Sequence, residues 1–465
     1  MKDELNPSTL VLILLTATLA IYVPAFDGDF HYDDLSSILD NPHLERWHTF
    51  LTHLDHMVRP VLYATFLLDR SLYGPHPLGY HLLNLLLHVG SGILLYRILT
   101  NAVQDKASSI PFWAALLFLI HPIATETVTY ISGRASGLMA FFYLLALYLY
   151  VRASQQPNGS GRWYLSGSIA SFLLSIASKE TAVTFPIMLL LWDRLIRRKQ
   201  GSDMRAAVIS GHLPFWIGLL LVAVWAWSHP RYTALAEFSF SIRPFWDHLL
   251  SEAHAVAYAL LLVFSPWNQN FDHDFPVFHS LTQWPLPLDL LLLTGTVAAG
   301  VIAWRRSPLV AFGLAWCFIQ LLPTTLIPRN DLLSERNLYL PSIGLLLAIV
   351  ALGSHLIHWL QTTVRRPVLV RVGSSVLATA LIAVLCLFTY QRNLLYRDPF
   401  LLWSDTVAKS PDKARPHNNL GYAYAVHGDW DSAIEEFRAA AQLDPDYVLA
   451  QENLRDAYLH RVGRQ

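Results

Sequence analysis

Five aspartates follow the first apolar run of the chain, at Asp27, Asp29, Asp33, Asp34 and Asp40. Such a cluster can simply be a solvated surface. The adjacent pair Asp33-Asp34 is a better candidate for chemistry, because it comes directly after Phe30 and Tyr32 and a desolvated carboxylate gains basicity. Neighbours in an extended segment point to opposite sides, so one residue would be a general base while the other anchors the loop or a cation. Asp34 is slightly preferred as the base.

Two further polar segments interrupt apolar runs. HPIATETVTYISGRASG contributes His121, Glu126 and Arg134, although His121 and the proline after it also fit a helix stop. SKET places Lys179 and Glu180 between two apolar runs with almost no loop. Charges at such depth are expensive and usually functional, but an internal salt bridge explains them equally well.

A fourth polar segment, IPRNDLLSERNLYLPSIG, supplies Arg329, Glu335 and Arg336 ahead of another apolar run. The distribution of Lys and Arg among the loops predicts that this loop lies outside the cytoplasm, where arginine is less common. A bound anion such as a phosphate would explain the arginines. A helix end or an ion pair with Glu335 would also explain them.

The composition shows what must position these loops. Of 465 residues, 54% are apolar and 14% are charged, and mean hydropathy is +0.36. These values exclude a soluble globular enzyme. The net charge of -1 lacks the excess of positive charge that is typical of proteins that bind nucleic acid. A membrane span needs ~20 apolar residues, so we expect an all-α polytopic membrane protein. Cys317 and Cys386 lie in apolar runs, which favours packing over a disulfide.

Eleven apolar runs have roughly the length of a span. They lie near 8–25, 79–98, 111–124, 135–151, 163–178, 181–193, 207–228, 287–304, 308–326, 339–360 and 372–390. Lys and Arg accumulate in alternate loops, including those at 194–205 and 365–371, which predicts a cytoplasmic N-terminus. The alternation requires that the run at 250–264 does not cross, so we expect a re-entrant or interfacial helix there. Eleven crossings would place the C-terminal tail outside.

The tail carries a 34-residue pattern that starts at Ala414. It has the small and aromatic residues of a tetratricopeptide repeat in register, namely Leu420, Gly421, Tyr424, Ala433, Phe437, Ala440 and Pro445, with His417 where the pattern favours Trp. We expect a membrane domain over 1–391 and a repeat module over 392–465, with one full repeat at 414–447 and a partial repeat on each side. So short a module should pack on the membrane domain or on a partner.

These loops together resemble a known family. The segments YDDLSSILDNPHL, HPIATETVTYISGRASGL, SKE and SERNLYLPSIG resemble, in the same order, motifs of the transmembrane O-mannosyltransferases that end in tetratricopeptide repeats, a branch of the C-type (GT-C) glycosyltransferases. RPVLYATFLLDRSLYGPHPLGYHLLNLLLH resembles the segment before that family's second span. The similarity covers nearly the whole chain. The animal members carry long repeat arrays and this chain carries barely one and a half repeats, so sugar and acceptor do not carry over.

The resemblance implies a GT-C bundle that transfers a sugar from a polyprenyl-phosphate donor to a hydroxyl, Ser or Thr of a protein, on the periplasmic or lumenal side. Asp33 or Asp34 would be the base of an inverting reaction. The donor phosphate would be held by Arg59, Arg134, Lys179 and Arg336, and the orienting residues would be His121, Glu126, Glu180 and Glu335. The repeat module would bind a protein or peptide acceptor. A bacterial inner membrane is expected, with the endoplasmic reticulum membrane as the alternative.

The residue types suit this reaction without the analogy. Displacing a phosphate from an anomeric carbon needs a carboxylate on the attacking side and cations on the leaving side. No nucleotide is needed, which agrees with the lack of a GxxxxGK(S/T) or GxGxxG loop. No cofactor is required by the sequence, although a divalent cation, Mg²⁺ or Mn²⁺, could be bridged by Asp34 and Glu126. Two alternatives stay open, namely a glycan ligase or polymerase with a lipid or glycan acceptor, and a transporter or flippase of polyprenyl-linked sugars.

Overall fold

The computed structural model describes residues 6–462 apart from 104, 106–107, 157–159 and 198–203. Every regular element in this part of the chain is a helix. The long helices are α1 (Pro7–Tyr22), α4 (Pro77–Ala102), α5 (Ile110–Ile120), α7 (Arg134–Gln155), α8 (Gly161–Ser178), α10 (Met204–Ser228), α13 (Leu286–Arg306), α14 (Pro308–Leu326), α15 (Tyr339–Thr363) and α16 (Pro367–Leu395). Some of the basic residues at 194–205 lie outside the described residues.

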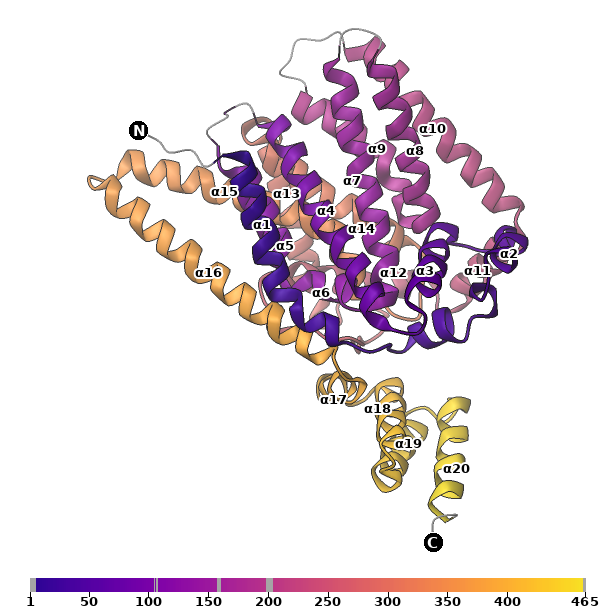
Figure 1. The fold of residues 1–465 in the computed structure, drawn as a ribbon. Coiled ribbons are helices and arrows are strands. Elements are labelled where there is room, and N and C mark those ends of the chain that lie inside the picture. Colours follow the sequence, from indigo (N-terminus) through magenta and orange to yellow (C-terminus); the bar gives the residue numbers. More distant parts are fainter. Residues whose placement is uncertain (1–5, 104, 106–107, 157–159, 198–203, 463–465) are drawn as a thin grey trace.

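The other helices lie in the connections and in the tail. They are α2 (Trp47–Thr52), α3 (Pro60–Tyr73), α6 (Thr125–Val128), α9 (Phe185–Leu191), α11 (Pro230–Ser241), α12 (Phe245–Leu262), α17 (Pro399–Lys409), α18 (Ala414–Val426), α19 (Trp430–Leu443) and α20 (Val448–Val462). Figure 1 shows the start of α1 and the tail helices at opposite ends of the bundle.

The chain is an integral membrane protein, but the span count differs from eleven. Among the described helices eight are long and apolar enough to cross a membrane, and a ninth results if Ile110–Ile120 and Pro122–Val128, bent by 56°, form one span. The two other expected spans correspond to α8 and to the stretch 180–196. α8 is rich in Ser and Gly, which lowers its apolarity. The stretch 180–196 is broken into three short helices.

α12 covers the run at 250–264 and is not among the helices that are apolar enough to span. Both of its ends contact the same end of the bundle. Near its start, Nε2 of His248 donates to the carbonyl of Thr325 at the end of α14. Just after its end, the carbonyl of Val263 accepts from Nε2 of His121 at the end of α5. These contacts are compatible with the re-entrant or interfacial helix expected from the sequence, which stays a prediction.

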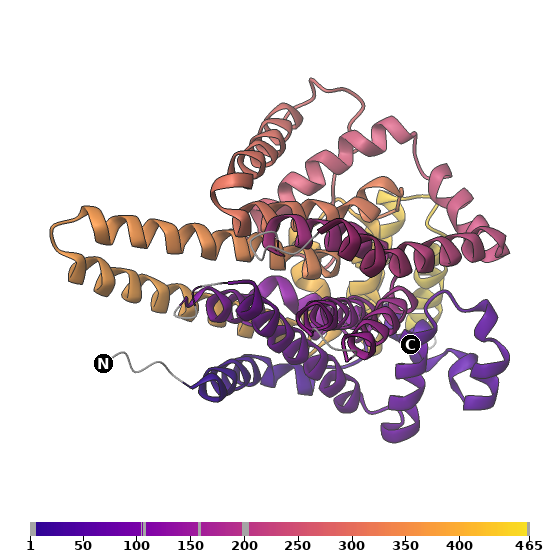
Figure 2. The same cartoon turned by 90° about the horizontal axis from the view of Figure 1, so that it is seen from above.

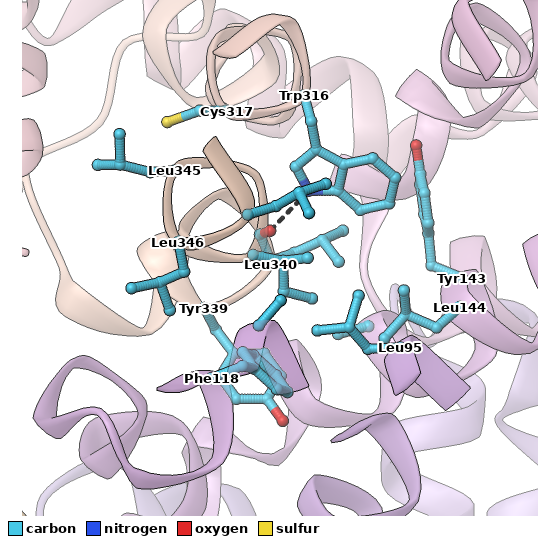
Figure 3. Close-up of a cluster of buried hydrophobic side chains, with 14 of the residues drawn as sticks. Leu95, Phe118, Tyr143, Leu144, Trp316, Cys317, Tyr339, Leu340, Leu345 and Leu346 are labelled. Atoms are coloured by element: carbon cyan, nitrogen blue, oxygen red, sulfur yellow. Dashed lines mark hydrogen bonds between the residues drawn. The ribbon is translucent and has the colours of Figure 1, made fainter. Parts of the chain in front are cut away.

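The core lies where α5, α7, α14 and α15 meet, and Figure 3 shows its side chains. Trp316 of α14 is buried, and its indole donates a hydrogen bond of 2.8 Å to the carbonyl of Leu340 on α15. The two helices approach so closely that a Cβ at Gly344 would lie 2.2 Å from the carbonyl oxygen of Gly313. Cys317 packs in the same cluster, and both cysteines are free as predicted.

The outside of the bundle is suited to lipid. α10, α13 and α16 bury few of their side chains, and Figures 1 and 2 show the α15–α16 hairpin extending away from the other helices. Exposed Trp227, Trp267 and Trp284 lie at or beside the ends of helices, and tryptophan prefers the membrane–water boundary.

The tail packs on the membrane domain. α16 continues through Arg392 to Leu395, so the expected boundary at 392 falls in the last turn of this helix. Leu402 of α17 shares a buried cluster with Tyr130 and Tyr396. Within the tail, α18 and α19 pack so tightly that a Cβ at Gly421 would lie 2.8 Å from the ring of Phe437.

Candidate functional site

A cavity of about 250 Å³ opens at the end of the bundle that faces the tail. Its walls come from all four polar segments and from the start of α3, and they contain Asp33, Arg59, Lys179 and Arg336, four of the predicted site residues. The other lining residues are Ser37, Leu62, Tyr63, Phe66, Ser132, Ala135, Ser136, Arg329, Asn330, Asp331, Ser334 and Asn337. Segments that are far apart in the sequence therefore form one site.

The lining is rich in positive charge. Four cations, Arg59, Lys179, Arg329 and Arg336, face a cavity whose only lining carboxylates among the described residues are Asp33 and Asp331. The charge of Asp331 is engaged by the tail, because Arg415 donates to it at 2.7 Å and Lys413 at 3.2 Å. A surplus of cations in an enclosed site favours an anionic ligand.

Lys179, like Arg329, forms no ion pair with a carboxylate among the described residues. Its ammonium is buried and donates hydrogen bonds of 2.7 Å to Oγ of Ser136 and to Oδ1 of Asn337. No carboxylate in the described part of the chain lies within ion-pair distance of it. Burial lowers the pKa of Lys179 well below its usual value. The adjacent Glu180 is paired with Arg59 instead, so the alternative of a salt bridge between Lys179 and Glu180 does not apply.

Two arginines are held in place by glutamates. Arg59 forms a two-point contact with Glu180, at 2.7 and 3.1 Å. Burial would raise the pKa of Glu180, but Arg59 lowers it to about 2. Glu126 accepts from the backbone N–H of Arg336 at 2.9 Å and lies 3.7 Å from its guanidinium. Glu180 and Glu126 therefore contact Arg59 and Arg336, and their predicted role as orienting residues stays a prediction.

Asp33 is the acidic residue of the first loop that faces the cavity. Its side chain is 39% exposed and lies 3.6 Å from the guanidinium of Arg336. Its backbone N–H donates to the hydroxyl of Tyr130 at 3.1 Å. The carboxylate is thus available to a ligand while the backbone behind it is fixed.

Asp34 points the other way, although the sequence slightly favoured it as the base. It is fully buried. It accepts hydrogen bonds from the backbone and hydroxyl of Ser132 and from the backbone of His31. Burial raises the pKa of Asp34 to about 7. It does not line the cavity, so Asp34 is placed as the anchor of the loop and Asp33 as the better candidate base.

Arg134 was expected to hold phosphate, but it lies outside the cavity lining. Its guanidinium is completely buried and forms a 2.5 Å ion pair with Asp69. It also donates to Oδ1 of Asn84 and to the carbonyl of Tyr80, and it lies over the ring of Phe66. With these partners Arg134 joins α3, α4 and α7, and it does not line the cavity.

His121 and Glu335 are also placed in the framework. His121 accepts from the backbone N–H of Ile123 and donates to the carbonyl of Val263, so it ends α5 and holds α12. Glu335 is buried and accepts from the side chain of Gln269, the backbone of Asn270 and the ring of His273. Neither residue orients one of the cavity cations directly.

The pair proposed for a divalent cation does not suit one. Both carboxylate oxygens of Asp34 accept hydrogen bonds, and those of Glu126 accept from Ser334 and from the backbone of Arg336. The described residues also contain no group of three or more His, Cys, Asp or Glu side chains that could hold a metal ion. These two residues are therefore committed to holding the loops.

Asp331, Ser136 and Asn337 were not predicted as site residues. Each is adjacent or nearly adjacent in the sequence to a charged residue of a polar segment, and this proximity was the available signal. Their roles depend on side-chain direction: Ser136 and Asn337 point to Lys179, and Asp331 points to the tail.

Comparisons with known proteins concern the chain as a whole and its tail. Residues 414–447 match the tetratricopeptide repeat family, which confirms the predicted repeat. The chain is 27% identical to Protein O-mannosyl-transferase F38B6.6 of Caenorhabditis elegans, covering 94% of this chain and 63% of that protein. It is 27% identical to Protein O-mannosyl-transferase TMTC4 of Mus musculus, covering 94% and 67%. It is 25% identical to the TMTC1 protein of Homo sapiens, covering 97% and 57%.

Among solved structures, ArnT from Cupriavidus metallidurans bound to undecaprenyl phosphate aligns with 89% of this chain and 80% of its own, at 14% identity and a TM-score of 0.41. The match to F38B6.6 covers 63% of that protein, so the chain spans less than two thirds of its length. The similarity to these three relatives nevertheless covers 94–97% of this chain. The chain is a distant homologue of the transmembrane protein O-mannosyl-transferases and is glycosyltransferase-like by that homology.

Proposed function

We propose that this chain transfers a sugar from a polyprenyl-phosphate donor to a hydroxyl of Ser or Thr in a protein, with inversion at the anomeric carbon. The observation that carries the proposal is a cavity with one available carboxylate, Asp33, and a surplus of cations around Lys179. The distant homology to O-mannosyl-transferases supports this choice of reaction.

In the proposed reaction Asp33 accepts the proton of the acceptor hydroxyl while the oxygen attacks the anomeric carbon. The bond from that carbon to the phosphate oxygen breaks in the same step, and the lipid phosphate leaves with the bonding electrons. Lys179 and Arg336 stabilise the charge that grows on the phosphate. Arg59, held by Glu180, adds a third cation to that wall. A single displacement of this kind inverts the configuration.

A ligase or polymerase that uses a lipid or glycan acceptor would need the same base and cations, so it is the second candidate. A transporter or flippase is less favoured, because the charged residues of the cavity gather at one end of the bundle. We place the site on the periplasmic side of a bacterial inner membrane, with the lumenal side of the endoplasmic reticulum as the alternative.

The test is transfer by the purified full-length protein in lipid nanodiscs. Radiolabelled polyprenyl-phosphate mannose and polyprenyl-phosphate glucose would be offered separately, with a pool of Ser/Thr peptides as acceptor. Label in the peptide fraction that is lost in Asp33→Asn is the expected result. Label that enters only a lipid or glycan fraction would favour the ligase, and movement of intact donor between leaflets without cleavage would favour the flippase.

A further inference from the structure

Tyr32, directly before Asp33, has an unusual backbone conformation. Its φ is 45°, and it is the only non-glycine residue with a positive φ in the described part of the chain. A bulky side chain disfavours this conformation, which persists only where the surroundings hold it in place. The surroundings of Tyr32 therefore determine the direction in which Asp33 points.

The tail supplies those surroundings. The ring of Tyr32 packs edge-on against Trp403 of α17, with ring centres 5.8 Å apart. The guanidinium of Arg415, on α18, lies 5.8 Å from the centre of the same ring. Aromatic edge contacts and cation–π contacts both have a preferred geometry, so together they restrain the ring more than apolar burial would.

Arg415 is itself fixed to the membrane domain. Its Nε donates to Asp272 at 2.7 Å, and its Nη2 donates to both Asp272 and Asp331. Lys413 reaches the same two carboxylates. Burial would raise the pKa of Asp331, but the positive charges of Arg415 and Lys413 lower it. Because Asp331 lines the cavity, this charge cluster joins the tail directly to the wall of the site.

The tail also contacts a residue that holds the backbone of Asp33, namely Tyr130. Leu402 of α17 shares a buried cluster with Tyr130, whose hydroxyl accepts the backbone N–H of Asp33. On the other side of Asp33, Asp34 is anchored to Ser132. The carboxylate of Asp33 thus projects from a backbone that is restrained before, at and after this position.

We infer that the first two tail helices, α17 and α18, position the catalytic carboxylate, with Trp403 and Arg415 holding Tyr32 so that Asp33 faces the cavity. Calling Asp33 catalytic rests on the proposed function, whereas the restraint of the loop does not. Trp403, Arg415 and Tyr32 are positioning residues. The module therefore contributes to the chemical step, beyond any role in binding an acceptor.

Amide hydrogen exchange of the full-length protein in nanodiscs tests the restraint without any substrate. Arg415→Ala, Trp403→Ala and Tyr32→Ala should each accelerate exchange over residues 31–34 by roughly tenfold or more, because local opening controls that rate. Peptides from α5 and α14 should keep their rates. Tyr32→Phe keeps the ring and should restore the protection. Arg438→Ala is the matched control, since Arg438 is on the same module and contacts only Tyr458 among its described hydrogen-bond partners.

The second readout is transfer from a polyprenyl-phosphate sugar at saturating acceptor. Misplacing a reacting group by about 1 Å can cost ~10²-fold, so Arg415→Ala and Tyr32→Ala should lower kcat about 10- to 100-fold and change KM for the donor less than twofold. Wild-type exchange at 31–34 in all three alanine variants would overturn the inference, as would an unchanged kcat. If the wild-type protein transfers no sugar at all, the proposed function fails, while the exchange experiment still decides whether the tail restrains the loop.

Discussion

The carboxylate of Asp33 lies 3.6 Å from the guanidinium of Arg336, in the wall of one cavity. An inverting displacement needs the base on the attacking side of the anomeric carbon and the phosphate-binding cations on the leaving side, so both groups must border the same cavity. The guanidinium of Arg336 also lies 3.7 Å from the carboxylate of Glu126. Burial would lower the pKa of Arg336, but Glu126 raises it, so the cation stays charged.

Replacing Asp33 by Asn should remove catalysis and leave donor binding intact. The amide keeps the shape of the side chain but accepts no proton, and general bases contribute ~10²–10⁴-fold to turnover. We expect kcat to fall by that factor, with the donor dissociation constant within threefold of wild type. Turnover and equilibrium binding of radiolabelled donor measure the two quantities. Near wild-type turnover in a folded Asp33→Asn protein would rule out this base.

Asp34→Asn should behave differently, because Asp34 is a buried anchor. One of its oxygens accepts from the backbone of His31, where an amide NH₂ would meet another donor. We expect a lower melting temperature and faster exchange of the first loop. A loss of turnover with unchanged stability would return Asp34 to the role of base.

The same residue predicts a pH dependence of stability. Its pKa is raised to about 7 in the folded protein, from about 3.9 in an unfolded chain. A carboxyl whose pKa is raised by folding stabilises the folded state fully only at pH values below its pKa in the unfolded chain. This contribution is lost as pH rises through 7. Melting temperature should therefore fall between pH 5 and pH 8 in the wild type and change less in Asp34→Asn.

Lys179 should couple donor binding to a proton. Burial lowers the pKa of Lys179 in the free protein, and a nearby phosphate would raise it. Binding then takes up a proton at pH values between the two pKa values, so donor affinity should fall as pH rises through this interval. Lys179→Gln should bind ~10–100-fold more weakly, since hydrogen bonds to charged groups contribute ~1.5–3 kcal/mol. Calorimetric titrations at several pH values test this. An equal pH slope in the variant would exclude Lys179 as the source.

The sequence identified the loops better than it identified the residues within them. Apolar content and loop motifs were enough to predict a membrane protein with one polar site, and four of the predicted residues line it. The sequence could not show which of Asp33 and Asp34 faces the cavity. Their directions depend on the positive φ of Tyr32 and on the hydrogen bond between Asp34 and Ser132, which is 98 residues away. The span count was also too high, since apolar length alone did not show that 180–196 is broken.

Topology gives a prediction that needs no substrate. Asp429 is exposed in the turn between α18 and α19, and Cys317 and Cys386 can be removed to leave a single thiol. A cysteine at position 429 should react with an impermeant reagent in spheroplasts if the tail is periplasmic. Labelling only after lysis would place the tail, and with it the cavity, in the cytoplasm.

Arg134 distinguishes a structural arginine from a phosphate-binding one. Its partner Asp69 is 3% exposed, so Arg134→Ala leaves a carboxylate buried without its counter-ion. Breaking such a pair costs about 3–5 kcal/mol, and we expect a large loss of folded protein by size-exclusion chromatography. The double variant Arg134→Met with Asp69→Leu removes both charges and should recover part of the yield. Arg59→Ala is the matched control: Arg59 lines the cavity and is partly exposed, so this variant should fold normally and bind donor weakly. If Arg134→Ala folded like the wild type and lost only donor affinity, Arg134 would belong to the phosphate site after all.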